Sequence, residues 1–155
     1  MANTGIIDGG DLLLYVEIAA VWTLIGEAKS HTLSRKSEVR TRRTKITGKY
    51  PARKVIGLDA TVTTDCLATY GTYGYYELCA LQEAKTAVKL KLAGKVTAGD
   101  SLAEDVGDKY QEATFVIDSI DLNASEGDDA GYTASFSIDG GASPNGLEIK
   151  TVVAP

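Results

Sequence analysis

The chain of 155 residues is 44% hydrophobic and 24% charged, which is typical of one soluble globular domain spanning residues 1–155. No run approaches the roughly 18 consecutive apolar residues that a membrane helix needs, and the first residues lack the basic and apolar regions of a secretory signal. We therefore expect synthesis in a cytoplasm and no membrane partner.

Charge is distributed very unevenly along the chain. Between Glu27 and Lys54 lie ten Lys/Arg and two acids, a net charge of +8, whereas the remaining residues include six basic and nineteen acidic side chains, a net charge of −13. A basic segment and an acidic body make each copy complementary to other copies of the same chain. Head-to-tail contacts of this kind build filaments or tubes.

The N-terminal third is predicted to contain a short buried strand followed by a long polar arm. The apolar run Leu12–Val16 predicts the strand. Residues 35–54 contain almost nothing that a core would bury, which favours a projecting loop or hairpin. The side chains that we expect to act in self-assembly are Arg35, Lys36, Arg40, Arg42, Arg43, Lys45, Lys49, Tyr50, Arg53 and Lys54.

Three uses of this basic arm are open. The arm can pair with an acidic surface of another subunit, project into solvent without a partner, or bind the phosphates of a nucleic acid. Against nucleic acid, Tyr50 is the only aromatic residue available for base stacking, and the chain as a whole is acidic, with a net charge of −5. Pairing with another subunit is therefore the preferred interpretation.

The middle of the chain combines alternating strands with one helical segment. Period-2 alternation predicts strands at 56–63 and 88–92, each with one packed face. The apolar positions of these strands are Ile56, Leu58, Ala60, Val62, Val88, Leu90 and Leu92. Helix formers at helical spacing predict one helix at about residues 72–85, with Thr72 as its N-cap. Residues 95–108 keep no period and are predicted to form an irregular loop.

The C-terminal part is predicted to form further antiparallel strands. Residues 115–117 are apolar on both faces, as in a central strand, and residues 123–131 predict a hairpin turn. Alternation continues through 132–138 and 147–153. Together the elements predict a mainly β protein, an antiparallel β-sandwich or partly open barrel with one flanking helix and a long basic arm.

No motif in the sequence indicates catalysis. A P-loop, a nucleophile elbow and a dinucleotide fingerprint are all missing. His31 is the single histidine, and without a Cys/His cluster a structural role is preferred. Cys66 and Cys79 fit no zinc pattern and are interpreted as buried thiols, with a disulfide between them left open. We expect no enzyme activity, no catalytic or metal site and no cofactor.

The order of these elements resembles that of the major tail tube proteins of long-tailed bacteriophages of the siphophage type. The resemblance covers nearly the whole chain and consists of strand and helix patterns. The segments that carry it are Gly9–Val16, Ile25–Leu33, the Ser/Thr/Arg/Lys stretch that follows, Ala60–Val62, Gly74–Leu78, Val88–Leu92 and the final hairpins.

This resemblance implies a structural subunit of the virion tail that assembles into stacked, hexameric rings. Residues 35–54 occupy the place of the family's loop that bridges successive rings. DNA would pass through the tube without specific binding, helped by an acidic lining that repels phosphates. Implied partners are other copies of the chain and other tail proteins, such as the tape measure and tail terminator proteins.

Two other functions are weighed against this one. The first is a tube protein of a contractile injection or type VI-like secretion system, which shares the ring architecture. The second is a monomeric β-sandwich binding module for carbohydrate or nucleic acid. That module would require exposed aromatic residues such as Trp22, Tyr70, Tyr73 and Tyr75 to gather on one surface.

Overall fold

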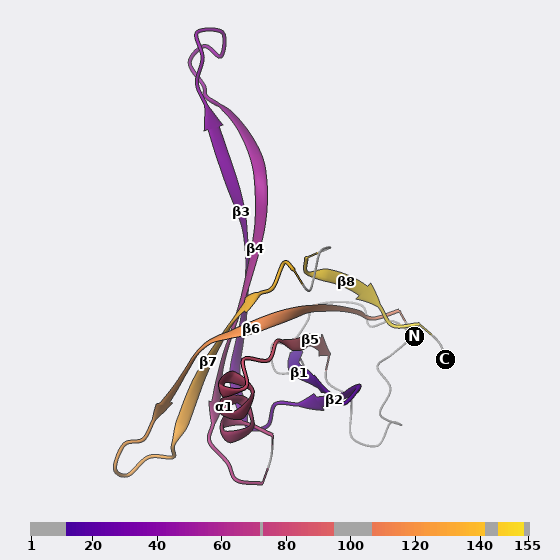
Figure 1. The fold of residues 1–155 in the computed structure, drawn as a ribbon, viewed down its shortest axis with the longest axis vertical. Coiled ribbons are helices and arrows are strands. Elements are labelled where there is room, and N and C mark those ends of the chain that lie inside the picture. Colours follow the sequence, from indigo (N-terminus) through magenta and orange to yellow (C-terminus); the bar gives the residue numbers. More distant parts are fainter. Residues whose placement is uncertain (1–11, 72, 95–106, 142–145, 154–155) are drawn as a thin grey trace.

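The computed structural model describes residues 12–71, 73–94, 107–141 and 146–153 (Figure 1). Within these residues eight strands form one antiparallel sheet in the order β2-β1-β5-β6-β7-β4-β3, with β8 paired to β6. The elements are β1 (Leu12–Ile18), β2 (Val21–Leu24), β3 (Ala28–Arg42), β4 (Ala52–Leu67), α1 (Tyr75–Glu83), β5 (Val88–Gly94), β6 (Lys109–Asn123), β7 (Gly131–Ile138) and β8 (Glu148–Thr151). The predicted mainly antiparallel β fold with a flanking helix is therefore confirmed.

The sheet curls around one hydrophobic core without closing into a barrel. Leu14 of β1 and Val62 of β4 belong to the same buried cluster, although β5, β6 and β7 lie between these strands in the sheet order. Widely separated parts of the sheet therefore cover the same core, which is the open arrangement that the alternation predicts. The largest fully buried side chains are Tyr132, Phe115, Phe136, Leu14, Ile25, Leu78, Leu90, Val16, Thr64 and Cys66.

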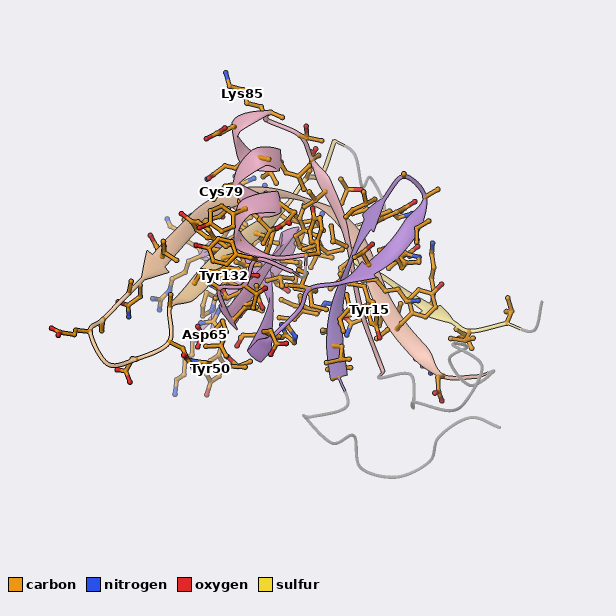
Figure 2. The ribbon with its side chains drawn as sticks, turned by 90° about the horizontal axis from the view of Figure 1, so that it is seen from below. Tyr15, Tyr50, Asp65, Cys79, Lys85 and Tyr132 are labelled. Carbon is orange, nitrogen blue, oxygen red and sulfur yellow. The ribbon has the colours of Figure 1, made fainter. Side chains whose placement is uncertain are left out.

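Helix α1 packs on this core and is shorter than predicted. Leu78 is fully buried, and Tyr75 contacts the ring of Tyr132, which lies between the helix and the sheet (Figure 2; centroids 5.7 Å apart). The N-cap is Gly74, not Thr72, which lies outside the described residues. The Glu77 carboxylate accepts a hydrogen bond of 3.0 Å from the Gly74 N–H. This contact fixes the helix start because it satisfies a backbone donor at the helix end.

The β3–β4 hairpin is the longest element and leaves the body of the molecule (Figure 1). The packed face predicted for residues 56–63 is only half right. Ala60 and Val62 are buried, whereas Ile56 is half-exposed and Leu58 is 77% exposed. The physical reason is that the hairpin continues past the end of the core, where no other part of the described chain covers it.

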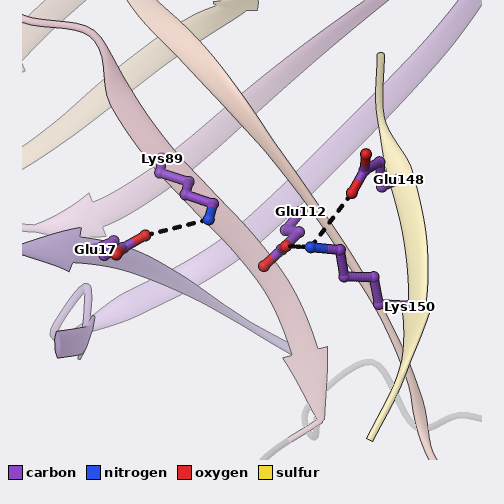
Figure 3. Close-up of polar contacts among 5 residues, drawn as sticks. All are labelled: Glu17, Lys89, Glu112, Glu148 and Lys150. Atoms are coloured by element: carbon purple, nitrogen blue, oxygen red, sulfur yellow. Dashed lines mark hydrogen bonds and ion pairs between the residues drawn. The ribbon is translucent and has the colours of Figure 1, made fainter. Parts of the chain in front are cut away.

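The C-terminal strand β8 is attached to the body by an ion-pair network (Figure 3). Lys150 forms an ion pair with the buried Glu112 of β6 and a second one, of 3.3 Å, with Glu148. These partners raise the pKa of Lys150, Glu112 most of all. The apolar residues expected to close the chain are mostly unburied, because Ile149 and Val153 are exposed. Electrostatic contacts thus hold β8 more than apolar burial does.

Replacing Lys150 with alanine is expected to lower the free energy of unfolding by about 1–3 kcal/mol, because the buried Glu112 carboxylate loses its cation. Urea denaturation measures this loss. The matched control is Glu148→Gln, which removes a charge from the exposed partner only and is expected to cost less than about 1 kcal/mol. Equal losses in the two variants would contradict the assignment of Glu112 as the important partner.

The loop predicted at 95–108 lies almost wholly outside the described residues. Within the described residues, no helix has the length and apolar character needed to cross a membrane.

Candidate functional site

The candidate site is the exposed part of the β3–β4 hairpin, residues 34–59, which we call the distal hairpin. Leu33 and Val62 form the last cross-strand pair that packs on the core. Beyond it, residues 34–42 of β3 extend about 30 Å at the usual rise of a strand. All side chains from 34 to 46 are exposed. The arm predicted at 35–54 thus forms most of a hairpin that stands away from the body (Figure 1).

One face of the distal hairpin is strongly basic. Arg40 lies opposite Lys54, and Arg42 lies opposite Ala52. Together with Arg53 and Ile56, these residues line a groove of about 210 Å³. Like charges placed directly opposite on neighbouring strands destabilise a sheet. An anionic partner from outside the hairpin would therefore stabilise this face.

The other face carries an apolar stripe, in which the sequence pointed to Val39 as a residue of the shared surface but not to Val55 or Leu58. Val39 lies opposite Val55, and Ser37 lies opposite Leu58. All three apolar side chains are exposed. A β-bulge between the Glu38 and Val39 pairs shifts the phase of β4 and brings Val55 opposite Val39. The sequence does show β-branched residues among the charged ones. Their position on one face of the hairpin, however, depends on the bulge.

The tip of the hairpin is an ordered turn with two exposed apolar side chains. The Thr44 and Thr47 backbones are joined by a hydrogen bond of 3.1 Å, and Gly48 adopts a φ of +65°, which a glycine accommodates without strain. Ile46 is 96% exposed and Tyr50 is 82% exposed. These two side chains are available for contact with another molecule.

The structure divides the ten predicted residues into three groups. Arg40, Arg42, Arg53 and Lys54 line the groove; Arg35 and Lys36 lie at the base of the hairpin; Arg43, Lys45, Lys49 and Tyr50 lie at the tip. In the part of the chain that the structure describes, no ion pair involves the distal hairpin. Its nine basic side chains therefore have no acidic partner among these residues.

A small polar network lies at the root of the hairpin. His31 Nδ1 is 2.8 Å from the Thr64 hydroxyl, which is 3.2 Å from the Cys66 thiol. Cys66 is buried, Cys79 is half-buried, and both are free thiols in the structure. His31 Nε2 is buried and has no hydrogen-bond partner among the residues that the structure describes. Burial lowers the pKa of His31, because the charged ring is poorly solvated away from water.

This environment predicts a pH-dependent stability. The unfolded chain binds a proton on histidine near pH 6.5, while the folded chain binds it only at lower pH, so stability falls as the pH drops below about 6.5. Unfolding by urea at pH 7 and pH 5 should show a larger loss for the parent than for His31→Asn. Identical losses in both proteins would exclude His31 as the source.

Among the strand edges that are unpaired within the described residues, those of β3 and β6 belong to the same part of the sheet. β3 is the last strand of the sheet order, so its outer edge is free. β5 pairs with β6 only through Gln111–Phe115, which leaves the same edge of β6 open from Val116 to Asn123. An open edge is a template for pairing with another chain. These two edges bound the four-stranded part of the sheet formed by β3, β4, β7 and β6.

The face of this four-stranded part that points away from the core is rich in hydroxyl groups and acids. Three rows run across the strands in register: Ser34, Thr61, Ser137 and Val116; Thr32, Thr63, Ser135 and Ser119; Ser30, Asp65, Thr133 and Asp121. None of these twelve side chains is basic. Two carboxylates and no cation on these rows disfavour the binding of phosphates.

The sequence by itself matches no protein-family profile and resembles no curated protein. Its fold, by contrast, is similar to solved phage-type tail structures. The SPP1 tail tube has a TM-score of 0.71 at 11% identity, over 96% of this chain and 81% of that one. A chain from the virion of a native gene transfer agent particle has a TM-score of 0.67 at 14% identity, over 96% of this chain and 100% of that one.

A third similar chain comes from the baseplate of the anti-feeding prophage. Its TM-score is 0.62 at 7% identity, over 97% of both chains. At such low identities the similarity establishes the fold of the chain. The resemblance to tail tube proteins drawn from the order of elements is therefore confirmed at the level of the fold.

Proposed function

We propose that this protein is the structural subunit of a phage tail tube, which assembles into rings that stack end to end. The observation that carries the proposal is the fold shared with the SPP1 tail tube and the gene transfer agent virion over 96% of the chain. The distal hairpin supports it, because its basic groove and exposed apolar tip have no partner among the described residues.

Ring formation is supported by the two free strand edges. Pairing the outer edge of β3 in one copy with the open edge of β6 in the next would satisfy both rows of backbone groups. Repeated around an axis, such a heterologous contact closes into a ring. The tail of an empty gene transfer agent particle, whose fold is also similar, has C6 symmetry, so we propose six subunits per ring.

The hydroxyl and acidic face fits the wall of the channel. Closure through β3 and β6 would give every copy the same orientation, and the face without basic residues could then line the lumen. DNA would slide along it without specific binding, since like charges repel. The protein would reside in the virion tail and meet tape measure and tail terminator proteins there, in a structural rather than catalytic role.

The second candidate is a tube-like component of a contractile injection system. The similarity to the anti-feeding prophage baseplate favours it, at a lower TM-score of 0.62 and 7% identity. The monomeric binding module is not favoured. Its four aromatic residues do not share one surface, since Trp22 lies on β2 beside Lys89 while Tyr70, Tyr73 and Tyr75 surround the start of α1.

Negative-stain electron microscopy of the purified protein tests the proposal. We expect rings at moderate concentration and tubes at high concentration. Single particles of monomer size at every concentration would contradict the tube function and favour the binding module.

A further inference from the structure

The C-terminal part of the chain contains a long segment with acids and no cations. Residues 110–149 contain eight acids and no Lys or Arg. Five of the acids lie in the end of the β6–β7 hairpin, residues 118–129, which we call the acidic hairpin: Asp118, Asp121, Glu126, Asp128 and Asp129. Asp118 accepts a hydrogen bond from Ser137, and no ion pair involves any of the five within the described residues.

The acidic and distal hairpins lie at opposite ends of the molecule. Figure 1 places the tip of the β3–β4 hairpin at one end of the long axis and the β6–β7 turn near the other. The view from below in Figure 2 shows the β6–β7 turn standing out from the body. Because the strands of the distal hairpin extend about 30 Å beyond the core, its tip cannot reach the acidic hairpin of its own chain. Only another copy can bring the two together.

Aromatic and apolar groups accompany the acids. The Ala68 N–H donates to the carbonyl oxygen of Ala130 in the β6–β7 turn, which holds the segment leading to Tyr70 beside this hairpin. Tyr70 is 92% exposed and stacks on Tyr76, with ring centroids 5.6 Å apart. Leu122, at the end of β6, is also half-exposed. Carboxylates beside exposed rings suit arginine, which pairs with acids and stacks on aromatic faces.

We propose, on the basis of the tube function, that the acidic hairpin together with Tyr70 is the docking surface for the distal hairpin of a second copy in the adjacent ring. The net charge of +8 on residues 35–54 meets −5 on residues 118–129. Ile46 and Tyr50 at the incoming tip find Tyr70 and Leu122 as apolar partners. A nucleic acid does not fit this surface, because five carboxylates repel phosphates.

A charge-swap experiment tests this pairing. The first variant reverses the acidic hairpin (E126K, D128K and D129K), and the second reverses the distal hairpin (R40E, R42E and R43E). Each variant alone is expected to raise the concentration at which tubes form by at least about tenfold, since like charges then face each other at every ring contact. Sedimentation and negative-stain microscopy measure this concentration.

An equimolar mixture of the two variants is the decisive sample. When rings of the two variants alternate, the glutamate-bearing distal hairpin of one variant meets the lysine-bearing acidic hairpin of the other. At the next ring contact an unchanged distal hairpin meets an unchanged acidic hairpin. Tubes should therefore return at a concentration close to that of the parent. Restored assembly also shows that both variants are folded. The matched control E83K, an exposed reversal at the end of α1, should assemble like the parent.

Two results would overturn the inference alone: tubes formed by the acidic-hairpin variant as readily as by the parent, or no restored assembly in the mixture. If the parent forms neither rings nor tubes, the tube function itself fails, and the docking inference fails with it.

Discussion

Reversing Arg40, Arg42 and Arg43 to glutamate is expected to raise the concentration at which rings stack into tubes by at least about tenfold while leaving the fold intact. The three substitutions change the charge of the distal hairpin by six units at residues whose side chains are exposed within the described chain. A single exposed ion pair contributes at most about 1 kcal/mol. Every subunit of a ring would carry the three reversals, however, so their effects on the contact between two rings would add up. Negative-stain microscopy should show isolated rings where the parent shows tubes.

Salt supplies an independent check of this prediction. The Debye length falls from about 8 Å at physiological ionic strength to about 3 Å at 1 M salt, so parent tubes should dissociate into rings as salt rises. Replacing the same three arginines with lysine keeps the charge and should preserve most of the assembly. Tubes of the glutamate variant that match those of the parent would show that the charge of the distal hairpin does not drive stacking.

Replacing Phe136 with alanine is expected to lower the free energy of unfolding by about 3–5 kcal/mol. Its side chain is fully buried, and its backbone pairs with Val62 of β4 on one side and Ile117 of β6 on the other. The cavity left at this position lies where the curled sheet packs on itself. Since domains of this size are stable by only about 5–15 kcal/mol, the variant should unfold at a much lower urea concentration.

The measurement is made on dilute protein, because assembly would raise the apparent stability. Tyr50→Ala is the matched control. It also removes an aromatic ring, but one that is 82% exposed, so its stability should change by less than about 0.5 kcal/mol. A loss for Phe136→Ala no larger than that of the control would contradict the central position of Phe136 in the core.

The helix and the hairpin turn show which features can be predicted from short stretches of sequence. Residues 123–131 connect β6 to β7 as the turn residues predict, since such turns depend on conformations only a few residues long. The helix exists but begins at Tyr75 instead of residue 72. Its start depends on a contact between the Glu77 side chain and the Gly74 backbone, which helix propensity does not describe.

The distal hairpin shows a feature, the burial of a strand face, that short stretches of sequence do not predict. Alternation correctly places Ala60 and Val62 on a buried face, yet Leu58, two residues away on the same strand, is exposed. Periodicity determines which residues share a face, but whether anything covers that face depends on strands distant in sequence. The β-bulge beside Val39 also changes which residues of β4 share a face, and the alternation of apolar and polar residues in the sequence does not show this change.

The sequence by itself determined the antiparallel β character, the single helix in the described chain and the segregation of basic from acidic residues, because these follow from composition and short-range periodicity. Only the tertiary structure decided that β3 and β4 extend beyond the core, that the edges of β3 and β6 are open, and that the basic and acidic hairpins lie at opposite ends of the molecule. The reason is that strand order and the curl of the sheet arise from contacts between segments far apart in the chain. The role of the ten arm residues in assembly stays a prediction until the variants are measured.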